Sequence, residues 1–177
     1  MDAGVHQLQG KAKGVKPSDI IALLQELYRE RTALYERHKA VATRVTPYDA
    51  NNAYQYVINR EETHLSWLAD ALAAAGATPA EPPTGPTLTI ERGKDAWKKL
   101  VEDDARLAEA FLAKWRPRVE ALSNARHQTM LRLMLGEIEE QTRMLEQAAT
   151  GHIDVLGHSD TGAGSRGQVG IARWIGD

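Results

Sequence analysis

The positions of proline and glycine divide this chain into long segments that are almost free of helix-breaking residues. Four of the seven prolines lie between positions 79 and 86, and seven of the fourteen glycines lie from Gly151 onward. Long helices are therefore permitted in the segments between these stretches, because proline and glycine are the residues that helices tolerate least. Apolar residues in those segments recur every three to four positions, which predicts an all-α chain.

We expect four helices, over residues 19–45, 47–75, 91–116 and 123–150. Ser18 and Thr46 are suitable N-cap residues for the first two helices, and Pro47 suits a first helical position. Pro117 is expected to kink or end the third helix, and Gly151 suits the position just after the fourth. Only residues 168–175 show an alternation that is typical of a strand.

The connections between these helices predict their topology. The first two helices are joined almost directly and the last two by a few residues, so each pair forms an antiparallel hairpin. Residues 77–90 are proline-rich and would reach about 43 Å when extended, which matches a helix of about 40 Å. Such a connection is typical of a four-helix bundle with one long crossover. We therefore expect an N-terminal arm over residues 1–17, a bundle over 18–150 and an extended C-terminal tail over 151–177.

The composition limits the chemistry. A net charge of −2, from 24 acidic and 22 basic residues, argues against a nucleic-acid partner. The absence of cysteine excludes thiolate catalysis and cysteine-held metal centres, so any metal must be held by histidine and carboxylates. The sequence contains no long apolar run and its opening residues lack the apolar stretch of a secretory signal, so we expect a cytoplasmic protein without a membrane partner.

Several acidic residues are predicted to point into the bundle at one depth. Glu30 and Glu61 are each fifteen positions from the turn that joins the first two helices. Glu30 lies three residues after Leu27 and four before Leu34, which places it on the apolar stripe, and Glu61 has the same relation to its own apolar neighbours. His64 follows Glu61 at i+3, on the same helix face.

The second hairpin repeats this pattern. Asp104 lies in the core register of the third helix. Glu137 on the fourth helix is predicted to lie at the same depth, because both residues are about equally far from the turn near residue 121. Glu140 occupies the i+3 position after Glu137. The second hairpin therefore presents Glu-x-x-Glu where the first presents Glu-x-x-His.

This set of residues resembles the ferritin-like and rubrerythrin-like di-iron carboxylate proteins. The resemblance spans residues 18–150 and is strongest in the run Arg-Glu-Glu-Thr-His-Leu-Ser-Trp-Leu at positions 60–68. Asp104 is shorter than the usual glutamate, and Glu140 stands where a histidine is usual. The resemblance implies a ferritin-like four-helix bundle in which Glu61 bridges two metal ions. His64 and Glu30 would hold one ion, and Asp104, Glu137 and Glu140 the other.

Oxygen ligands with one imidazole suit iron or manganese, and zinc is an alternative. In the resembling family, such a centre activates dioxygen or peroxide, or oxidises and stores ferrous iron. The resemblance thus implies a possible di-iron oxidoreductase, and its electron donor would be external because the chain has no cysteine for a rubredoxin-like centre.

A competing hypothesis is a metal-free ferritin-like scaffold that acts through oligomerisation or partner binding. In it, the acids Glu30, Asp104 and Glu140 pair with arginines such as Arg31, Arg106, Arg132 or Arg143. The two hypotheses predict different geometry, because a metal centre requires the six side chains to converge within a few ångströms with no arginine among them. His38 and His127 lack a second histidine at metal spacing, so we expect them to be structural or exposed.

The tail is too apolar for a simple solvated segment. Its apolar residues are Ile153, Val155, Leu156, Val169, Ile171, Trp174 and Ile175. We expect it to pack over its own bundle or over a neighbour's, consistent with a homodimer. Residues 162–167 match G-x-G-x-x-G, but they follow a terminated helix instead of a strand, so we do not expect a dinucleotide site.

Overall fold

The computed structural model describes residues 17–82, 84–89, 93–152 and 155–156. The predicted arm before residue 17, the G-x-G-x-x-G segment, the possible strand at 168–175 and the tail beyond residue 156 lie outside the described residues. Within the described part, the regular secondary structure consists of four helices, which confirms the all-α prediction. The helices are α1 (Pro17–Ala42), α2 (Tyr48–Ala74), α3 (Ala96–Glu120) and α4 (Ala125–Ala149).

The helix ends differ from the predicted ends by a few residues. Pro47 precedes α2 in an extended conformation and is its N-cap, not its first helical residue. Helix α3 begins at Ala96, later than expected, and it continues through Pro117 to end three residues afterwards. Pro117 has no backbone N–H to donate to residue 113, so α3 loses one hydrogen bond there and still continues for three residues. Asn124 caps α4 by accepting a hydrogen bond from the backbone N–H of His127 at 3.0 Å.

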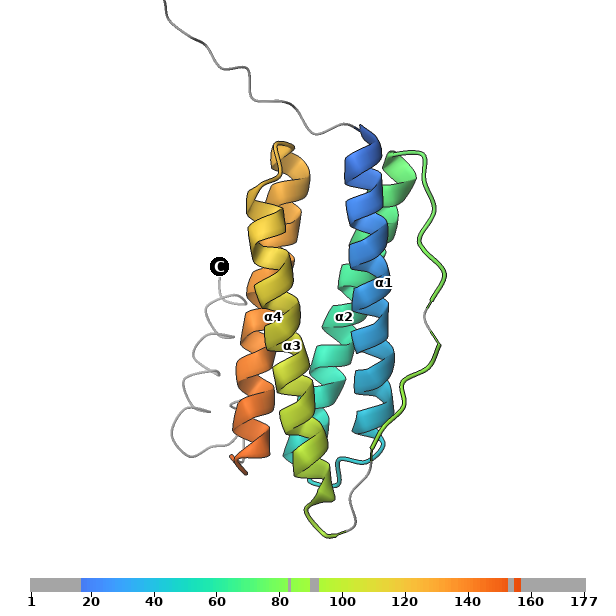
Figure 1. Cartoon of the computed structure of the whole chain (residues 1–177). Coiled ribbons are helices and arrows are strands. Elements are labelled where there is room, and N and C mark those ends of the chain that lie inside the picture. Colours follow the sequence, from blue (N-terminus) through green and yellow to red (C-terminus); the bar gives the residue numbers. More distant parts are fainter. Residues whose placement is uncertain (1–16, 83, 90–92, 153–154, 157–177) are drawn as a thin grey trace, which may run out of the picture.

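The four helices form a bundle of two antiparallel hairpins, α1–α2 and α3–α4 (Figure 1). Residues 75–95 connect the hairpins. The described residues of this connection run along the outside of the bundle beside α1, from the end of α2 toward the opposite end, where α3 begins. The side-chain amide of Gln25 donates to the carbonyl oxygen of Thr78 at 3.1 Å and ties this connection to α1. The long crossover is confirmed, and because of it α1 begins and α4 ends at opposite ends of the bundle.

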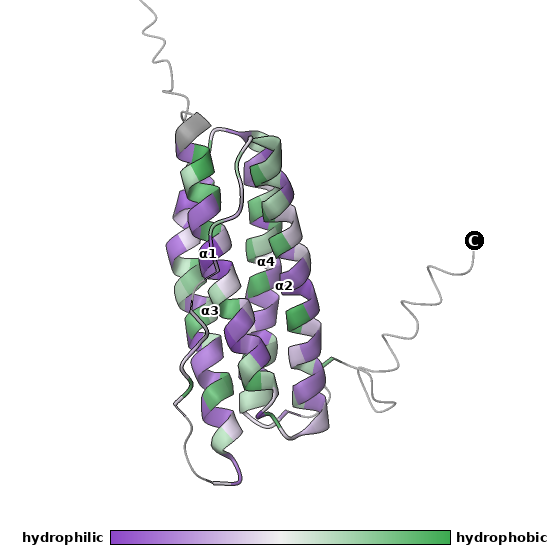
Figure 2. Cartoon of the chain, turned by 90° about the vertical axis from the view of Figure 1, so that its right-hand side faces the viewer, coloured by the Kyte–Doolittle hydropathy of each residue, from purple (hydrophilic) through white to green (hydrophobic). Residues whose placement is uncertain are grey.

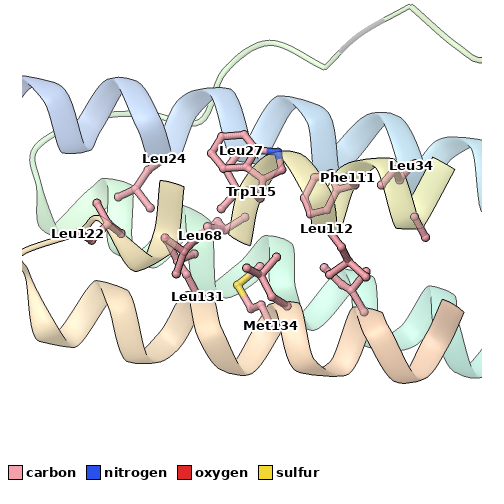
Figure 3. Close-up of a cluster of buried hydrophobic side chains, with 14 of the residues drawn as sticks. Leu24, Leu27, Leu34, Leu68, Phe111, Leu112, Trp115, Leu122, Leu131 and Met134 are labelled. Carbon is pink, nitrogen blue, oxygen red and sulfur yellow. The ribbon is translucent and has the colours of Figure 1, made fainter. Parts of the chain in front are cut away.

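Two hydrophobic clusters fill the interior. The first, shown in Figure 3, takes residues from all four helices, including Leu27, Leu68, Trp115 and Met134. The second lies toward the other end, around Val41, Tyr54, Trp97 and Leu145 among others. Apolar positions recur along each helix beside polar ones, so the apolar side chains can face inward together (Figure 2). Among the described residues, no helix is both long and apolar enough to cross a membrane.

Candidate functional site

Six polar side chains are buried between the two hydrophobic clusters, and we refer to them as the polar layer. None of them is more than 3% exposed, and every helix contributes at least one. The polar layer consists of Arg31 and His38 from α1, Glu61 and His64 from α2, Asp104 from α3, and Gln141 from α4. A buried polar group costs free energy unless it is paired, so the contacts of these side chains decide what the layer can do.

The helical repeat directs these residues inward. The buried side chains of α1 follow alternating steps of three and four residues, as is usual for helices packed side by side. These steps run through Leu24, Leu27, Arg31, Leu34, His38 and Val41. Gln141 occupies an equivalent position in α4, between Ile138 and Leu145. Each of these polar residues therefore replaces an apolar core residue.

The guanidinium of Arg31 lies at the centre of the polar layer. Its Nη1 lies 3.0 Å from Oε1 of Glu61. Its Nη2 donates to Oε1 of Gln141 at 3.1 Å and lies 3.3 Å from Nδ1 of His64. Burial lowers the pKa of Arg31 and the charge of Glu61 opposes that shift, but a guanidinium keeps its proton in proteins. The centre of the layer thus holds a permanent positive charge.

His64 is held as a neutral imidazole. Burial, together with the nearby charge of Arg31, lowers its pKa to about 4. Since Nδ1 faces a donor from Arg31, the ring proton is assigned to Nε2, which donates to Oε2 of Glu137 at 2.8 Å. His64 therefore links the guanidinium in the interior to a carboxylate at the edge of the bundle.

Glu61 is buried and ionised. Burial acts to raise the pKa of its carboxyl group, but Arg31 and His38 outweigh burial and hold the pKa below its usual value. Nδ1 of His38 donates to the same oxygen, Oε1, at 2.9 Å. Four buried atoms of the layer have no hydrogen-bond partner among the described residues: Nε of Arg31, Nε2 of His38, Oε2 of Glu61 and Nε2 of Gln141. These atoms give the layer unused hydrogen-bonding capacity.

Asp104 has its own partners on the other side of the layer. Its Oδ1 accepts a hydrogen bond from Nε of Arg37 at 2.5 Å, and its Oδ2 accepts one from the hydroxyl of Tyr54 at 2.7 Å. Burial and the charge of Asp104 raise the pKa of Tyr54 well above its usual value, so its hydroxyl remains a donor. Both oxygens of Asp104 are therefore already paired with protein groups.

Three arginines offset three carboxylates in and around the polar layer. Arg31 pairs with Glu61 and Arg37 with Asp104. Arg60 makes a two-pronged contact with Glu137, in which its Nε donates to Oε2 at 3.0 Å and its Nη2 to Oε1 at 2.6 Å. With His64 neutral, these pairs leave no excess negative charge for a metal ion to compensate.

Comparison with solved structures identifies the architecture. The chain is similar to a conserved hypothetical protein from Mycobacterium tuberculosis, with a TM-score of 0.64 and 16% identity over 76% of this chain and 99% of that one. It is also similar to a mutant of Dps1 from Mycobacterium smegmatis, with a TM-score of 0.56 and 18% identity over 75% of this chain and 96% of that one. The protein has a ferritin-like fold. No protein-family model and no curated protein sequence matches the chain.

These two structures support the ferritin-like part of the expected resemblance, and at such identities the similarity concerns the fold alone. The finer, rubrerythrin-like relation stays a prediction.

The six predicted metal ligands of this ferritin-like bundle do not converge. Glu61 and His64 lie in the polar layer, and Glu137 lies at its edge with a side chain that is 27% exposed. Asp104 is buried but is held by Arg37. Glu30 and Glu140 are turned away from the layer. Among the described residues, no three histidine, aspartate or glutamate side chains form a group that could hold a metal ion.

Glu30 and Glu140 face other surroundings than the sequence predicted. Glu30 lies between α1 and α3, where Nε1 of Trp115 donates to its Oε2 at 2.9 Å and Lys114 forms an ion pair with it. Glu140 has a side chain that is 67% exposed and pairs with Arg143, as the metal-free hypothesis expected for that residue. The other three arginines of that hypothesis pair with acids other than those it named. Arg31 pairs with Glu61, Arg106 with Asp103 and Arg132 with Glu120.

The error has a simple physical origin. Steps of three and of four residues both return to nearly the same helix face. Either Glu30 or Arg31 can therefore share the inward face of α1 with Leu27 and Leu34. The observed rotation of α1 about its axis places Arg31 inward. In α4 the same one-residue difference directs Gln141 inward instead of Glu140.

A pair of metal ions does not fit the polar layer as it is arranged. The guanidinium of Arg31 lies within 3.3 Å of Glu61 and His64, in the space that an ion bound to both would need. His64 also uses its other ring nitrogen to donate to Glu137, so that nitrogen has no lone pair to offer. The protein supplies its own cation at the position where the resemblance placed a metal.

Sequence reasoning missed several members of this network. His38 was expected to be structural or exposed, and the structural alternative is correct, but its buried contact with Glu61 was not predicted. Arg37, Arg60 and Gln141 were not considered as partners at all. The signal that identifies His38 and Gln141 is the unbroken alternation of three- and four-residue steps through them, but nothing in the spacing predicts which acids Arg37 and Arg60 reach from the flanks of their helices.

Proposed function

We propose that this ferritin-like bundle is a scaffold that acts through association with other copies of itself or with partner proteins, and that protein cations take the place of metal ions in its interior. The observation that supports this proposal is the buried guanidinium of Arg31, which contacts both Glu61 and His64. A permanent charge at that position would repel a divalent ion.

Metal analysis of the full chain, purified without chelators and then exposed to ferrous iron, manganese or zinc, tests this proposal. We expect far less than one ion per chain. Glu61→Ala and His64→Ala serve as controls, and neither should change the result. One or more ions per chain in the wild type, lost in both variants, would overturn the metal-free proposal.

Association is tested separately by sedimentation velocity over a range of protein concentrations. The expected result is a homodimer or larger assembly whose population rises with concentration. A monomer throughout, with no partner needed for stability, would contradict the homo-oligomeric part of the proposal.

The competing proposal is a di-iron or di-manganese centre for redox chemistry with oxygen species or for iron handling. It is supported by the placement of Glu61, His64 and Glu137 along one path of contacts. It requires Arg31 to leave its position and to give up its contacts with Glu61, His64 and Gln141. The same metal analysis decides between the two proposals.

A further inference from the structure

The outward face of the first three turns of α2 is almost uncharged and rich in tyrosine. Tyr48 is 78% exposed and Tyr56 is 47% exposed, and Asn52 and Asn59 lie beside them along the helix. Asp49 is the single charged residue at its edge. Tyrosine is enriched and charged residues are depleted where proteins bind one another. This face therefore has the composition of a contact surface.

This face forms one wall of a hollow of about 520 Å³, which we call the α2 hollow. Val155 and Leu156, which follow α4, also line this hollow. Val155 also packs against the second hydrophobic cluster, so the start of the tail is held beside α2 (Figure 2). The last described residues before 157–177 are therefore part of the lining of this hollow.

The length and chemistry of residues 157–177 suit the α2 hollow. Twelve residues separate Leu156 from the apolar run that contains Val169, Ile171 and Trp174. A twelve-residue chain without regular structure spans about 20 Å on average, and the α2 face from Tyr48 to Asn59 is about 17 Å long. The apolar run is therefore within reach of the whole face.

Charge and size both favour this occupant. Arg173 adjoins Trp174 in sequence and is complementary to Asp49 at the rim of the hollow. A second copy of the chain would need a larger surface, because stable dimer interfaces bury more than about 1,000 Å². A tethered segment needs far less area, because its effective concentration near the hollow is on the order of millimolar.

We propose that residues 169–175 dock in the α2 hollow of the same chain, with the side chain of Trp174 against Tyr48 and Tyr56. This inference goes beyond the proposed function and does not depend on whether the interior binds metal. Docking covers the exposed tyrosines and makes the C-terminal segment part of the surface that α2 presents to other proteins.

Crosslinking of full-length variants tests the proposal directly, since the chain contains no natural cysteine. Asn52→Cys is combined with Ala172→Cys, and the pair is treated with a short bis-maleimide. The matched control combines Ala172→Cys with Glu102→Cys, at an exposed position on α3 that does not line the α2 hollow. We expect crosslinking within one chain to be roughly tenfold faster in the first pair, since docking concentrates the two thiols.

Adding Trp174→Ala to the first pair should remove most of this difference, while the far-ultraviolet circular dichroism of the bundle stays unchanged. Equal rates in the two pairs, or an enrichment that survives Trp174→Ala, would overturn the proposal. Crosslinks that form mainly between chains and increase with protein concentration would also overturn it, because they would assign the hollow to a second copy.

Discussion

At the scale of single residues, the central interaction is the contact between Arg31 and Glu61 in a site closed to water. Removing two charges from water is costly, and their attraction compensates only when the geometry and the surrounding hydrogen bonds are good. Here His38, His64 and Gln141 supply those hydrogen bonds. The Arg31–Glu61 pair is therefore coupled to its neighbours, and loss of either residue leaves the charge of the other buried without a counter-charge.

Arg31→Met tests this coupling. The methionine fills part of the space but leaves the Glu61 carboxylate buried without its cation, so we expect a loss of about 3–5 kcal/mol in the free energy of unfolding. Urea denaturation measures it. The matched control is Arg116→Met, which breaks an exposed pair with Glu139 and should cost at most about 1 kcal/mol. Similar losses in the two variants would contradict a special role for the buried pair.

The same substitution opens the layer to an external cation. Without the guanidinium, Glu61, His64 and Gln141 would face an uncompensated space, and a divalent ion could replace the missing charge. We therefore expect zinc to raise the melting temperature of Arg31→Met and to leave the wild type unchanged. Stabilisation of both proteins to the same extent would indicate binding elsewhere on the surface.

Acidification should weaken the fold through His64. Burial lowers its pKa from 6.5 to about 4, so the folded protein binds fewer protons than the unfolded chain between these values. Stability therefore falls as the pH decreases from 6.5 to 4, by about 3 kcal/mol in total from this group. Urea denaturation at a series of pH values should show this slope in the wild type and in His152→Gln, at an exposed position, but a much smaller slope in His64→Gln. An unchanged slope in His64→Gln would contradict the assignment.

At the scale of helices, the sequence predicted which segments form helices and how these helices are connected. It predicted less well how each helix is rotated about its own axis. The four helices, both hairpins and the crossover follow from the positions of proline and glycine and from connection lengths, which are local properties. The rotation of α1 and α4 was wrong by one residue, because Leu27 and Leu34 constrain it only to within one position. If the alternating steps of three and four residues had been followed from Leu24 to Val41, they would have given the correct rotation of α1.

The crossover between α2 and α3 has a minimum length. A helix of 25 residues is about 38 Å long, and seven connecting residues extend to about 29 Å at most. Deletion of residues 77–90 leaves seven residues, so we expect the bundle not to form. Deletion of residues 79–85 leaves a sufficient connection and preserves Thr78, which accepts from Gln25, so thermal melting should change little. Cooperative melting after the longer deletion would show that the hairpins can join in another topology.

At the scale of the whole molecule, the two hairpins are joined largely by polar contacts at their edges and by apolar packing at their centre. Glu26 pairs with Arg118 across the α1–α3 boundary, and Glu137 pairs with Arg60 across the α2–α4 boundary. Hydrogen bonds to Arg118 and Lys114 lower the pKa of Glu26 to about 2. Protonation of Glu26 and Glu137 therefore removes charged contacts that join the two hairpins.

We therefore expect a partly folded state at low pH. As the pH falls through the lowered pKa values of Glu137 and Glu26, the polar contacts between hairpins lose their charge and their stabilising effect. Helical far-ultraviolet dichroism should persist after the near-ultraviolet signal of the buried Trp115 is lost. Simultaneous loss of both signals would show that the hairpins do not outlast the bundle.

The crossover also separates the two ends of the bundle from which the chain emerges. Helix α1 starts at one end of the bundle and α4 stops at the other, where α2 begins (Figure 1). The α2 hollow is lined by the first turns of α2 and therefore lies toward this second end. An affinity tag or fluorophore placed ahead of residue 17 therefore joins the bundle about 20–40 Å from the residues that line that hollow. One end of this protein can be anchored to a surface or a reporter while the other remains accessible for binding measurements.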